Sequence, residues 1–267
     1  IKSGYGLSTG SELKMLRVIR RLKETSPIPV KASFLAAHAY PMAYKQNHQT
    51  YLDLIIKEML PRVAGEGLAD YIDVFCEEGF FSVAETEQLL DAAAKYNLPP
   101  KIHANQLSVS GAVQIGVKYG AVSVDHLEQT DDAVLESLKN STTMATLLPS
   151  CSFYLNIPFA DARGLIGAGA AVAIASDYNP GSSPSGNMNL VLSLACIKLK
   201  MLPEEAINAA TLNGAAAMQL SAETGSICRG KRANFFITPK HTPSLAFLPY
   251  SFGQPQQHKI ILNGKIY

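Results

Sequence analysis

The sequence predicts an α/β fold built from parallel strands, and three observations lead to that prediction. Short apolar segments with strand character alternate with helical segments along the chain. Side chains that can bind a metal or transfer a proton follow several of the apolar segments directly. No Gly-x-Gly-x-x-Gly pattern follows any of them, which argues against an open doubly wound sheet. These features favour a (β/α)8 TIM-like barrel, in which chemistry takes place at the C-terminal ends of the strands.

The alternation begins with what resembles a strand end at residues 1–4. Ser11 is a candidate N-cap for the next helix, because apolar residues recur at helical spacing from Leu13 to Leu22. Pro27 ends this helix, and residues 30–37 supply the next strand. The chain holds seven strand candidates, one fewer than a complete barrel. We therefore expect an N-terminally truncated chain that lacks the first strand.

The same order of strands and helices continues through residue 220. The expected strands are 71–77, 101–104, 123–126, 143–148 and 171–176, and the expected helices are 51–60, 83–96, 108–119, 131–139, 161–167, 190–200 and 203–220. Beyond them, short strand-like segments are separated by a Pro-rich loop; they are 225–231, 234–238 and 259–267. We expect residues 1–221 to form an incomplete barrel and residues 222–267 to form the C-terminal part of a small β-sandwich annex.

Composition excludes several classes of protein. With 47% hydrophobic and 17% charged residues, the chain has enough apolar material for a large core and is not disordered as a whole. A net charge of +1 without long basic runs gives no signal for binding nucleic acid or an acidic membrane surface. No apolar run reaches the length of a membrane span, and the four cysteines form no Cys-x-x-Cys pair. The sequence predicts a cytoplasmic protein that acts on a small molecule.

Two side chains at strand ends form the candidate metal site. His103 ends one predicted strand and Asp177 follows another, and both neutral imidazole and carboxylate bind divalent metals. A catalytic ion commonly takes three or more protein ligands, so neighbouring strands or a preceding segment must supply the others. For His103 the alternative is a structural histidine held by hydrogen bonds.

Further candidates for chemistry follow other predicted strands. His126 is placed to donate to a carbonyl oxygen or to hold an attacking water, and Gln106 offers an amide that both donates and accepts hydrogen bonds. Tyr5 and His38 lie at the tips of the first two visible strands and are candidates for gripping a substrate. Capping and packing remain the alternatives for these four residues.

Two more groups of polar residues lie at strand tips. Asn179, Gly181 and Ser182 occupy a Pro-Gly turn whose backbone N–H groups are candidates for cradling a carboxylate, and an ordinary turn is the alternative. Glu77 and Glu78 lie at another strand tip. Adjacent residues of a strand point to opposite faces, so either one is a candidate partner for a metal ligand.

Seven short segments, taken in order, carry a family resemblance. They are residues 2–7 (KSGYGL), 38–41 (HAYP), 73–77 (DVFCE), 102–106 (IHANQ), 124–128 (VDHLE), 147–149 (LLP) and 176–182 (SDYNPGS). They resemble the imidazolonepropionase family of the amidohydrolase superfamily, which acts in histidine degradation. The resemblance covers essentially the whole chain. Its specificity comes from the number and order of the segments, because a single His or Asp motif would indicate only the superfamily.

The resemblance implies that His103 and Asp177 are two ligands of one zinc or iron ion. The family's other two ligands, a His-x-His on the first barrel strand, have no counterpart here, and neither does an arginine that grips the substrate carboxylate. The resemblance also implies contacts with the imidazolone substrate or its open product; the residues concerned are Tyr5, His38, Gln106, Ser182, Asn179 and Gly181. A homodimer is the default assembly of the superfamily.

The reaction of the family implies a role for each catalytic candidate. Metal-activated water attacks the carbonyl of 4-imidazolone-5-propanoate, the ring C–N bond opens, and N-formimino-L-glutamate leaves. Asp177 accepts the proton of the water and passes it to the leaving nitrogen, His126 stabilises the oxyanion, and Gln106 binds the ring. Two alternatives stay open: another cyclic-amide hydrolase or deaminase of the superfamily, and an inactive fragment without the upstream metal ligands.

Overall fold

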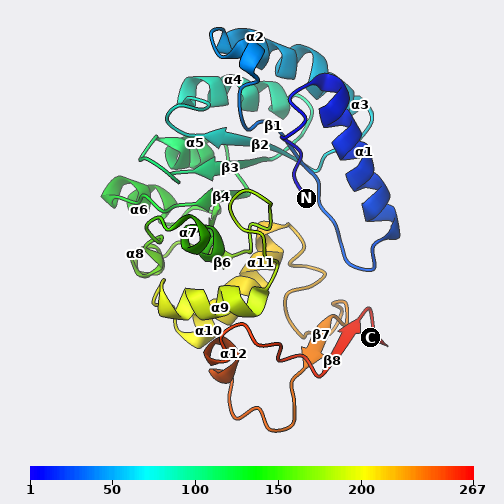
Figure 1. Ribbon diagram of the computed structural model, residues 1–267, viewed down its shortest axis with the longest axis vertical. Helices are drawn as coiled ribbons and strands as arrows, with labels where there is room; N and C mark the ends of the chain where they lie inside the picture. The colour runs from blue at the N-terminus through cyan, green and yellow to red at the C-terminus, as the bar shows by residue number, and fades with distance from the viewer. The chain divides into compact units, whose positions relative to one another are not determined.

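Helices and strands alternate along the chain in the computed structural model, which describes residues 1–267 (Figure 1). The contacts divide the chain into two compact units, Ile1–Val124 (unit 1) and Asp125–Tyr267 (unit 2). The boundary falls inside strand β4 (Ser123–His126), whose bounds agree with the predicted strand. The predicted division into a barrel over 1–221 and an annex over 222–267 stays a prediction.

Unit 1 contains three parallel strands that pair in chain order. They are β1 (Ser33–Ala37), β2 (Tyr71–Cys76) and β3 (Pro100–Ala104), and each matches a predicted strand with shifted ends. Lys2 forms a parallel bridge with Ser33, so the segment at the start of the chain pairs with β1, as a strand end would. Every residue of β1 and β2 is buried, which explains why nearly all of them are apolar.

The helices of unit 1 follow the apolar spacing of the sequence. Helix α1 (Thr9–Thr25) buries Leu13, Leu16 and Ile19, but its N-cap is Ser8, whose side chain accepts from the backbone of Ser11. The prediction of Ser11 as the cap is therefore wrong, because the helix begins three residues earlier. The remaining helical segments of the unit are η1 (Met42–Tyr44), α2 (His48–Leu54), the π-helical turn η2 (Ile55–Met59), α3 (Leu60–Gly65), α4 (Val83–Ala94) and α5 (Ala112–Lys118).

Unit 2 repeats the alternation with shorter strands. Strands β5 (Met144–Leu147) and β6 (Val172–Ile174) pair in parallel, and helices α10 (Pro203–Ala210) and α11 (Leu212–Ala217) pack on them. One helix was predicted over 203–220, but the chain breaks it at Thr211, whose ψ of −79° departs from helical geometry. The other helices of the barrel region are α6 (Asp132–Leu138), α7 (Pro149–Leu155), α8 (Ala162–Gly167) and α9 (Met188–Ile197).

The end of unit 2 forms a small antiparallel sheet. Strands β7 (Phe235–Ile237), β8 (Lys259–Leu262) and β9 (Lys265–Ile266) pair in this order, and helix α12 (Phe247–Tyr250) lies between β7 and β8 in the chain. The predicted strand at 225–231 is absent, because Gly225 and Gly230 both have φ of +90° and form turns. At Gly225 a Cβ would lie 2.7 Å from Ala215 Cβ, so this turn requires glycine.

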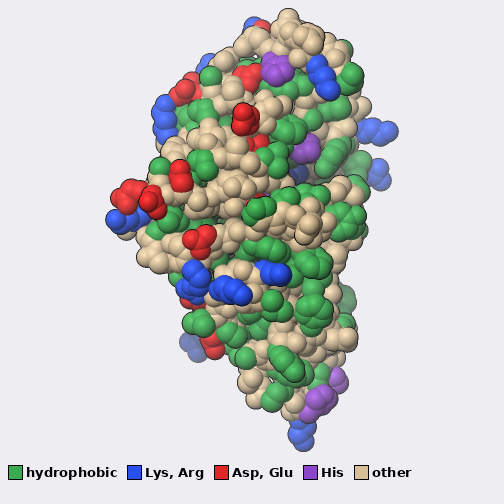
Figure 2. Space-filling model, turned by 60° about the vertical axis from the view of Figure 1, so that its left-hand side comes forward, with side chains coloured by type: hydrophobic (Ala, Val, Ile, Leu, Met, Phe, Trp, Pro, Cys, Tyr) green, Lys and Arg blue, Asp and Glu red, His purple; other side chains and the backbone are tan.

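The surface carries no area dominated by one sign of charge in the view of Figure 2. Acidic and basic side chains are interspersed there among hydrophobic and uncharged ones. None of the helices combines the length and the apolar character that crossing a membrane requires.

Candidate metal and catalytic site

In unit 1, His103 lies near the end of β3 beside a buried carboxylate. Its Nδ1 is 2.9 Å from Oδ1 of Asp73 on the neighbouring strand β2, and Asp73 is fully buried. Oδ2 of Asp73 accepts from Nζ of Lys2 at 2.6 Å, so both oxygens of this carboxylate have partners. Because His103 pairs with Phe75, Asp73 lies two residues earlier on the same face of the sheet.

This arrangement fits a metal ligand. When Nδ1 of a histidine donates to a carboxylate, the ring is fixed in one tautomer and orientation, and Nε2 keeps its lone pair for an ion. Such carboxylate–histidine pairs increase the basicity of the ligating nitrogen. Neither Glu77 nor Glu78, the two candidate partners from the sequence, takes this position: the carboxylate that contacts His103 in unit 1 is Asp73.

Glu77 instead holds the loop that follows β3. It is buried, and its carboxylate accepts from the backbone N–H groups of Leu107 and Ser108 and from the Ser108 hydroxyl. Glu78 is exposed. The predicted substrate residue Gln106 is half-buried and directly precedes this pinned backbone. Glu77 therefore fixes the loop that carries Gln106.

Two other predicted residues lie near His103. The ring centroids of Tyr5 and His38 are 5.0 Å apart, and those of His38 and His103 are 6.3 Å apart. Phe75 packs against both histidine rings. Tyr5 is 61% exposed, so a small molecule can reach its ring. The structure thus brings together three predicted residues that are far apart in sequence.

The backbone around Tyr5 is held by Glu12, which the sequence reasoning did not single out. Glu12 is fully buried at the start of α1 and accepts from the N–H groups of Gly4, Gly6 and Leu7 at 2.6 to 3.3 Å. A Cβ at Gly6 would lie 2.7 Å from the Glu12 nitrogen, so only glycine lets the loop approach this closely. The loop that presents Tyr5 is therefore rigidly anchored.

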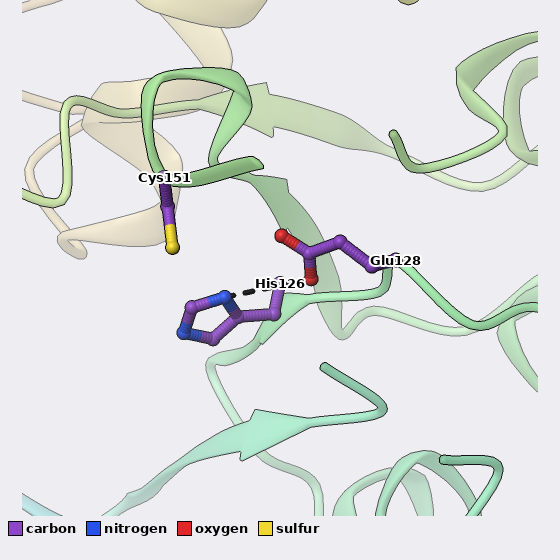
Figure 3. Close-up of side chains that lie close together, drawn as sticks. All are labelled: His126, Glu128 and Cys151. Carbon is purple, nitrogen blue, oxygen red and sulfur yellow. Dashed lines mark ion pairs between the residues drawn. The ribbon is translucent and has the colours of Figure 1, made fainter. Parts of the chain in front are cut away.

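In unit 2, His126 at the end of β4 is buried beside Glu128. Its Nδ1 is 3.5 Å from Oε2 of Glu128, and Cys151 of α7 lies close to both side chains (Figure 3). Burial lowers the pKa of His126, but the contacts with Cys151 and Glu128 outweigh burial and raise it to about 10. His126 is therefore an imidazolium near neutral pH, which can donate to a developing negative charge.

Left-handed backbone angles occur where these residues follow the strands, as they also do at several turns elsewhere in the chain. His126 and Leu127 have φ of +90° and +65°, Asp177 has +48°, and Asn105, directly after β3, has +55°. Non-glycine residues adopt such angles at a cost of about 1–3 kcal/mol each, and they cluster at functional sites. The strain supports a functional role for these three strand ends.

The turn after Asp177 is closed by its own side chains. Oδ1 of Asn179 accepts from the N–H groups of Gly181 and Ser182 at 2.9 and 2.8 Å, and the hydroxyl of Ser182 donates to Oδ2 of Asp177 at 3.3 Å. The expectation that these two N–H groups are open to a carboxylate is thus corrected, because Asn179 already accepts from them. Contacts of the three side chains with substrate stay a prediction.

Each unit carries one of the two predicted metal ligands. His103 belongs to unit 1 and Asp177 to unit 2, so a shared ion stays a prediction. Parallel strands followed by imidazole and carboxylate groups are typical of metal-dependent enzymes with an α/β-barrel fold. The chain belongs to the amidohydrolase family, whose family model matches residues 9–267.

Curated relatives are similar over the whole chain. The imidazolonepropionase of Christiangramia forsetii is 57% identical over 266 residues, and that of Flavobacterium johnsoniae is 54% identical over 266 residues. In both comparisons the matched region is 100% of this chain and 64% of the relative. The chain therefore spans 64% of the length of these relatives.

Solved structures confirm the predicted fold class. An adenosine deaminase from Xanthomonas campestris with bound zinc has a TM-score of 0.70 at 20% identity and covers 94% of this chain and 63% of its own. A guanine deaminase from C. acetobutylicum with bound guanine has a TM-score of 0.70 at 15% identity, over 97% of this chain and 69% of its own. At such identities the likeness shows the fold alone.

Proposed function

We propose that the protein hydrolyses the ring C–N bond of 4-imidazolone-5-propanoate to give N-formimino-L-glutamate, a step of histidine degradation in the cytoplasm. The observation that carries this proposal is the 57% identity to an imidazolonepropionase over the whole chain. Because the chain spans 64% of that relative, the activity is proposed for the full-length protein. A homodimer is the expected assembly.

His103 and Asp177 are the residues of this chain that would hold a zinc or iron ion. When bound, the ion would polarise the substrate carbonyl and activate a water molecule for attack. The observation that supports this assignment is the hydrogen bond between Nδ1 of His103 and the Asp73 carboxylate. With Nδ1 engaged in this way, Nε2 is the proposed ligating atom. Lys2 balances the buried negative charge of Asp73.

Asp177 is proposed to move the proton. Its carboxylate accepts the proton of the attacking water and then delivers it to the ring nitrogen that leaves. The Ser182 hydroxyl donates to Oδ2 of Asp177 and fixes the orientation of the carboxylate. Asn179 in turn donates from Nδ2 to the backbone oxygen of Asp177 at 2.7 Å, which stabilises its left-handed backbone.

His126 is proposed to stabilise the oxyanion that forms at the substrate carbonyl. An imidazolium donates a charge-assisted hydrogen bond, and a pKa raised to about 10 keeps the ring charged at neutral pH. Glu128 and Asp177 supply the negative charges that favour this form. Tyr5, His38 and Gln106 are proposed to bind the planar imidazolone ring.

Substrate preference of the full-length protein tests the proposal. We expect hydrolysis of imidazolonepropionate with a kcat/KM at least about 100-fold above that for dihydroorotate, hydantoins or cytosine, since differences in polar contacts to a substrate discriminate on this scale. A preference for one of the other rings would instead support another cyclic-amide hydrolase or deaminase of the family. Absence of turnover on all of them in a metal-loaded protein would contradict the proposal.

A further inference from the structure

Unit 2 holds a buried group of three different metal-binding side chains. His126, Glu128 and Cys151 offer an imidazole nitrogen, a carboxylate oxygen and a thiol sulfur, and these atoms all lie within 4.8 Å of one another. The three residues are 3%, 6% and 0% exposed. Figure 3 shows the thiol and the carboxylate approaching the imidazole from α7 and from the segment after β4.

Glu128 presents one oxygen to this group without a hydrogen bond. Its Oε1 accepts from the Ser152 hydroxyl at 2.9 Å, which fixes the carboxylate. Its Oε2 is buried and accepts no hydrogen bond, although it faces Nδ1 of His126 at 3.5 Å. A buried carboxylate oxygen in this state is costly, and a bound cation would satisfy it.

The distances suit a small tetrahedral ion better than a direct ion pair. A charge-assisted N–H to carboxylate hydrogen bond is about 2.7–2.9 Å long, clearly shorter than the observed 3.5 Å. With bonds of about 2.0–2.3 Å to nitrogen, oxygen and sulfur, the ligands of a tetrahedral zinc lie about 3.4–3.6 Å apart. The nitrogen and oxygen already have this separation, and the sulfur lies within 4.8 Å of both, so it needs to move by no more than about 1.2 Å.

We propose that His126, Glu128 and Cys151 form a second metal site that binds a thiophilic divalent cation such as zinc or cadmium. The ligand set differs entirely from His103 and Asp177. Sulfur and nitrogen donors together select such cations over magnesium or calcium. Three protein ligands leave one tetrahedral position for a water molecule.

The charges of the proposed ligands suit a divalent cation. A thiolate and a carboxylate carry two negative charges and a neutral imidazole carries none, so the three ligands balance the two positive charges of the ion. The burial of a net charge, which is the main cost of an ion in a protein interior, is thereby avoided.

The site would make the enzyme sensitive to thiophilic metals. An ion at His126 removes the imidazolium that we propose as the oxyanion donor, so its binding inhibits turnover. This consequence rests on the proposed function, whereas the binding of the ion does not. The two parts therefore need separate measurements.

Binding is tested by titrating cadmium into the full-length protein that already carries its catalytic metal. We expect one further equivalent of cadmium to bind with the ultraviolet charge-transfer band of a cadmium–thiolate bond, and X-ray absorption at the cadmium edge to show one sulfur neighbour among nitrogen and oxygen. Cys151→Ala should abolish the band. The matched control is Cys228→Ser, which changes an exposed cysteine and should leave the band intact.

Several results would overturn the site. A band that persists in Cys151→Ala or disappears in Cys228→Ser places the thiolate elsewhere, and a wild-type spectrum without sulfur excludes the site even if Cys151→Ala fails to fold. For inhibition, we expect bound cadmium to lower wild-type turnover about 100-fold, the effect of losing one oxyanion donor. Cys151→Ala at the same cadmium concentration should keep most of the rate that it shows without cadmium. If the protein turns over no imidazolonepropionate, the proposed function is wrong. The cadmium absorption band and the X-ray absorption spectrum would still show whether the second metal site exists.

Discussion

The two strand-end histidines differ in how a carboxylate holds them. In unit 1, Nδ1 of His103 makes a 2.9 Å hydrogen bond to Asp73, whose other oxygen is paired with Lys2. In unit 2, Nδ1 of His126 lies 3.5 Å from Glu128, and the backbone of His126 is in the left-handed region. The first arrangement orients the ring through a hydrogen bond at Nδ1, and the second raises the pKa of the ring.

The difference shows that the carboxylate partner decides what a strand-end histidine can do. Asp73 contacts Lys2 through one oxygen and Nδ1 of His103 through the other, which fixes the ring so that Nε2 is the atom proposed to bind an ion. Glu128 has no lysine in its ion pair, and His126 itself becomes the cation, with a pKa raised to about 10. The proposed metal ligand and the proposed oxyanion donor are thus the same residue type in two different settings.

The largest effect is expected for Asp177, which is proposed to bind the catalytic ion and to carry the proton in the reaction. Asp177→Asn in the full-length protein should lower kcat about 1,000-fold, because an amide cannot accept the proton of the attacking water. The control is Asp132→Asn, an exposed change on α6 that should leave kcat unaltered. A near-normal rate with the metal still bound would remove the proton-transfer role of Asp177.

A smaller loss is expected for the orienting carboxylate of unit 1. Asp73→Asn should weaken binding of the catalytic metal about 10- to 100-fold, because the ring of His103 loses its charged acceptor. Competition with a chelator, read by the metal content of the protein, measures this. Full affinity for the catalytic metal in Asp73→Asn, together with a loss of that affinity in Glu128→Gln, would contradict the roles assigned to the two carboxylates.

A further loss, of about tenfold in kcat, is expected for Glu128→Gln, which keeps the shape of the side chain and removes its charge. The pKa of His126 should fall, so the decline of kcat/KM on the alkaline side should begin at lower pH. The affinity for the catalytic metal should stay unchanged. An unaltered pH profile would show that Glu128 does not hold the charge of His126.

The smallest effect concerns stability. Native His126 keeps its proton up to a pKa of about 10, whereas an unfolded histidine loses it near pH 6.5. Its contribution to the free energy of unfolding is therefore fully present below about pH 6.5 and is lost as the pH rises toward 10. Urea unfolding of metal-free protein should show this decline, and Glu128→Gln should show a shallower one. An equal decline of the free energy of unfolding with pH in both proteins would contradict the role of Glu128 in raising the pKa of His126.

The strands and several helices could be predicted from the sequence because their apolar patterns involve residues that are close together in the chain. The apolar run at 123–126, which forms β4, and the apolar face of α1 are two examples. Helix α7 was not predicted because its buried residues are the consecutive Pro149, Ser150, Cys151 and Ser152, which form no apolar face at helical spacing. The break at Thr211 lies inside a continuous helical pattern.

The partners of the site residues needed the register of the strands and the path of the chain. His103 and Asp73 meet because β2 and β3 pair with Phe75 beside His103, and no short-range spacing encodes this. Cys151 reaches His126 only through the placement of α7. A signal for Glu128 was present, since it follows His126 by two residues in the segment 124–128. Glu12, at the start of an amphipathic helix, resembles an ordinary surface residue in sequence.

Anomalous X-ray scattering from crystals of the full-length protein tests the central claim most directly. Data at the zinc and iron absorption edges locate a bound ion and identify it. The account predicts one ion bonded to Nε2 of His103 and to the carboxylate of Asp177, with Nδ1 of His103 still on Asp73. A catalytic ion found without either of these two residues among its ligands would contradict it.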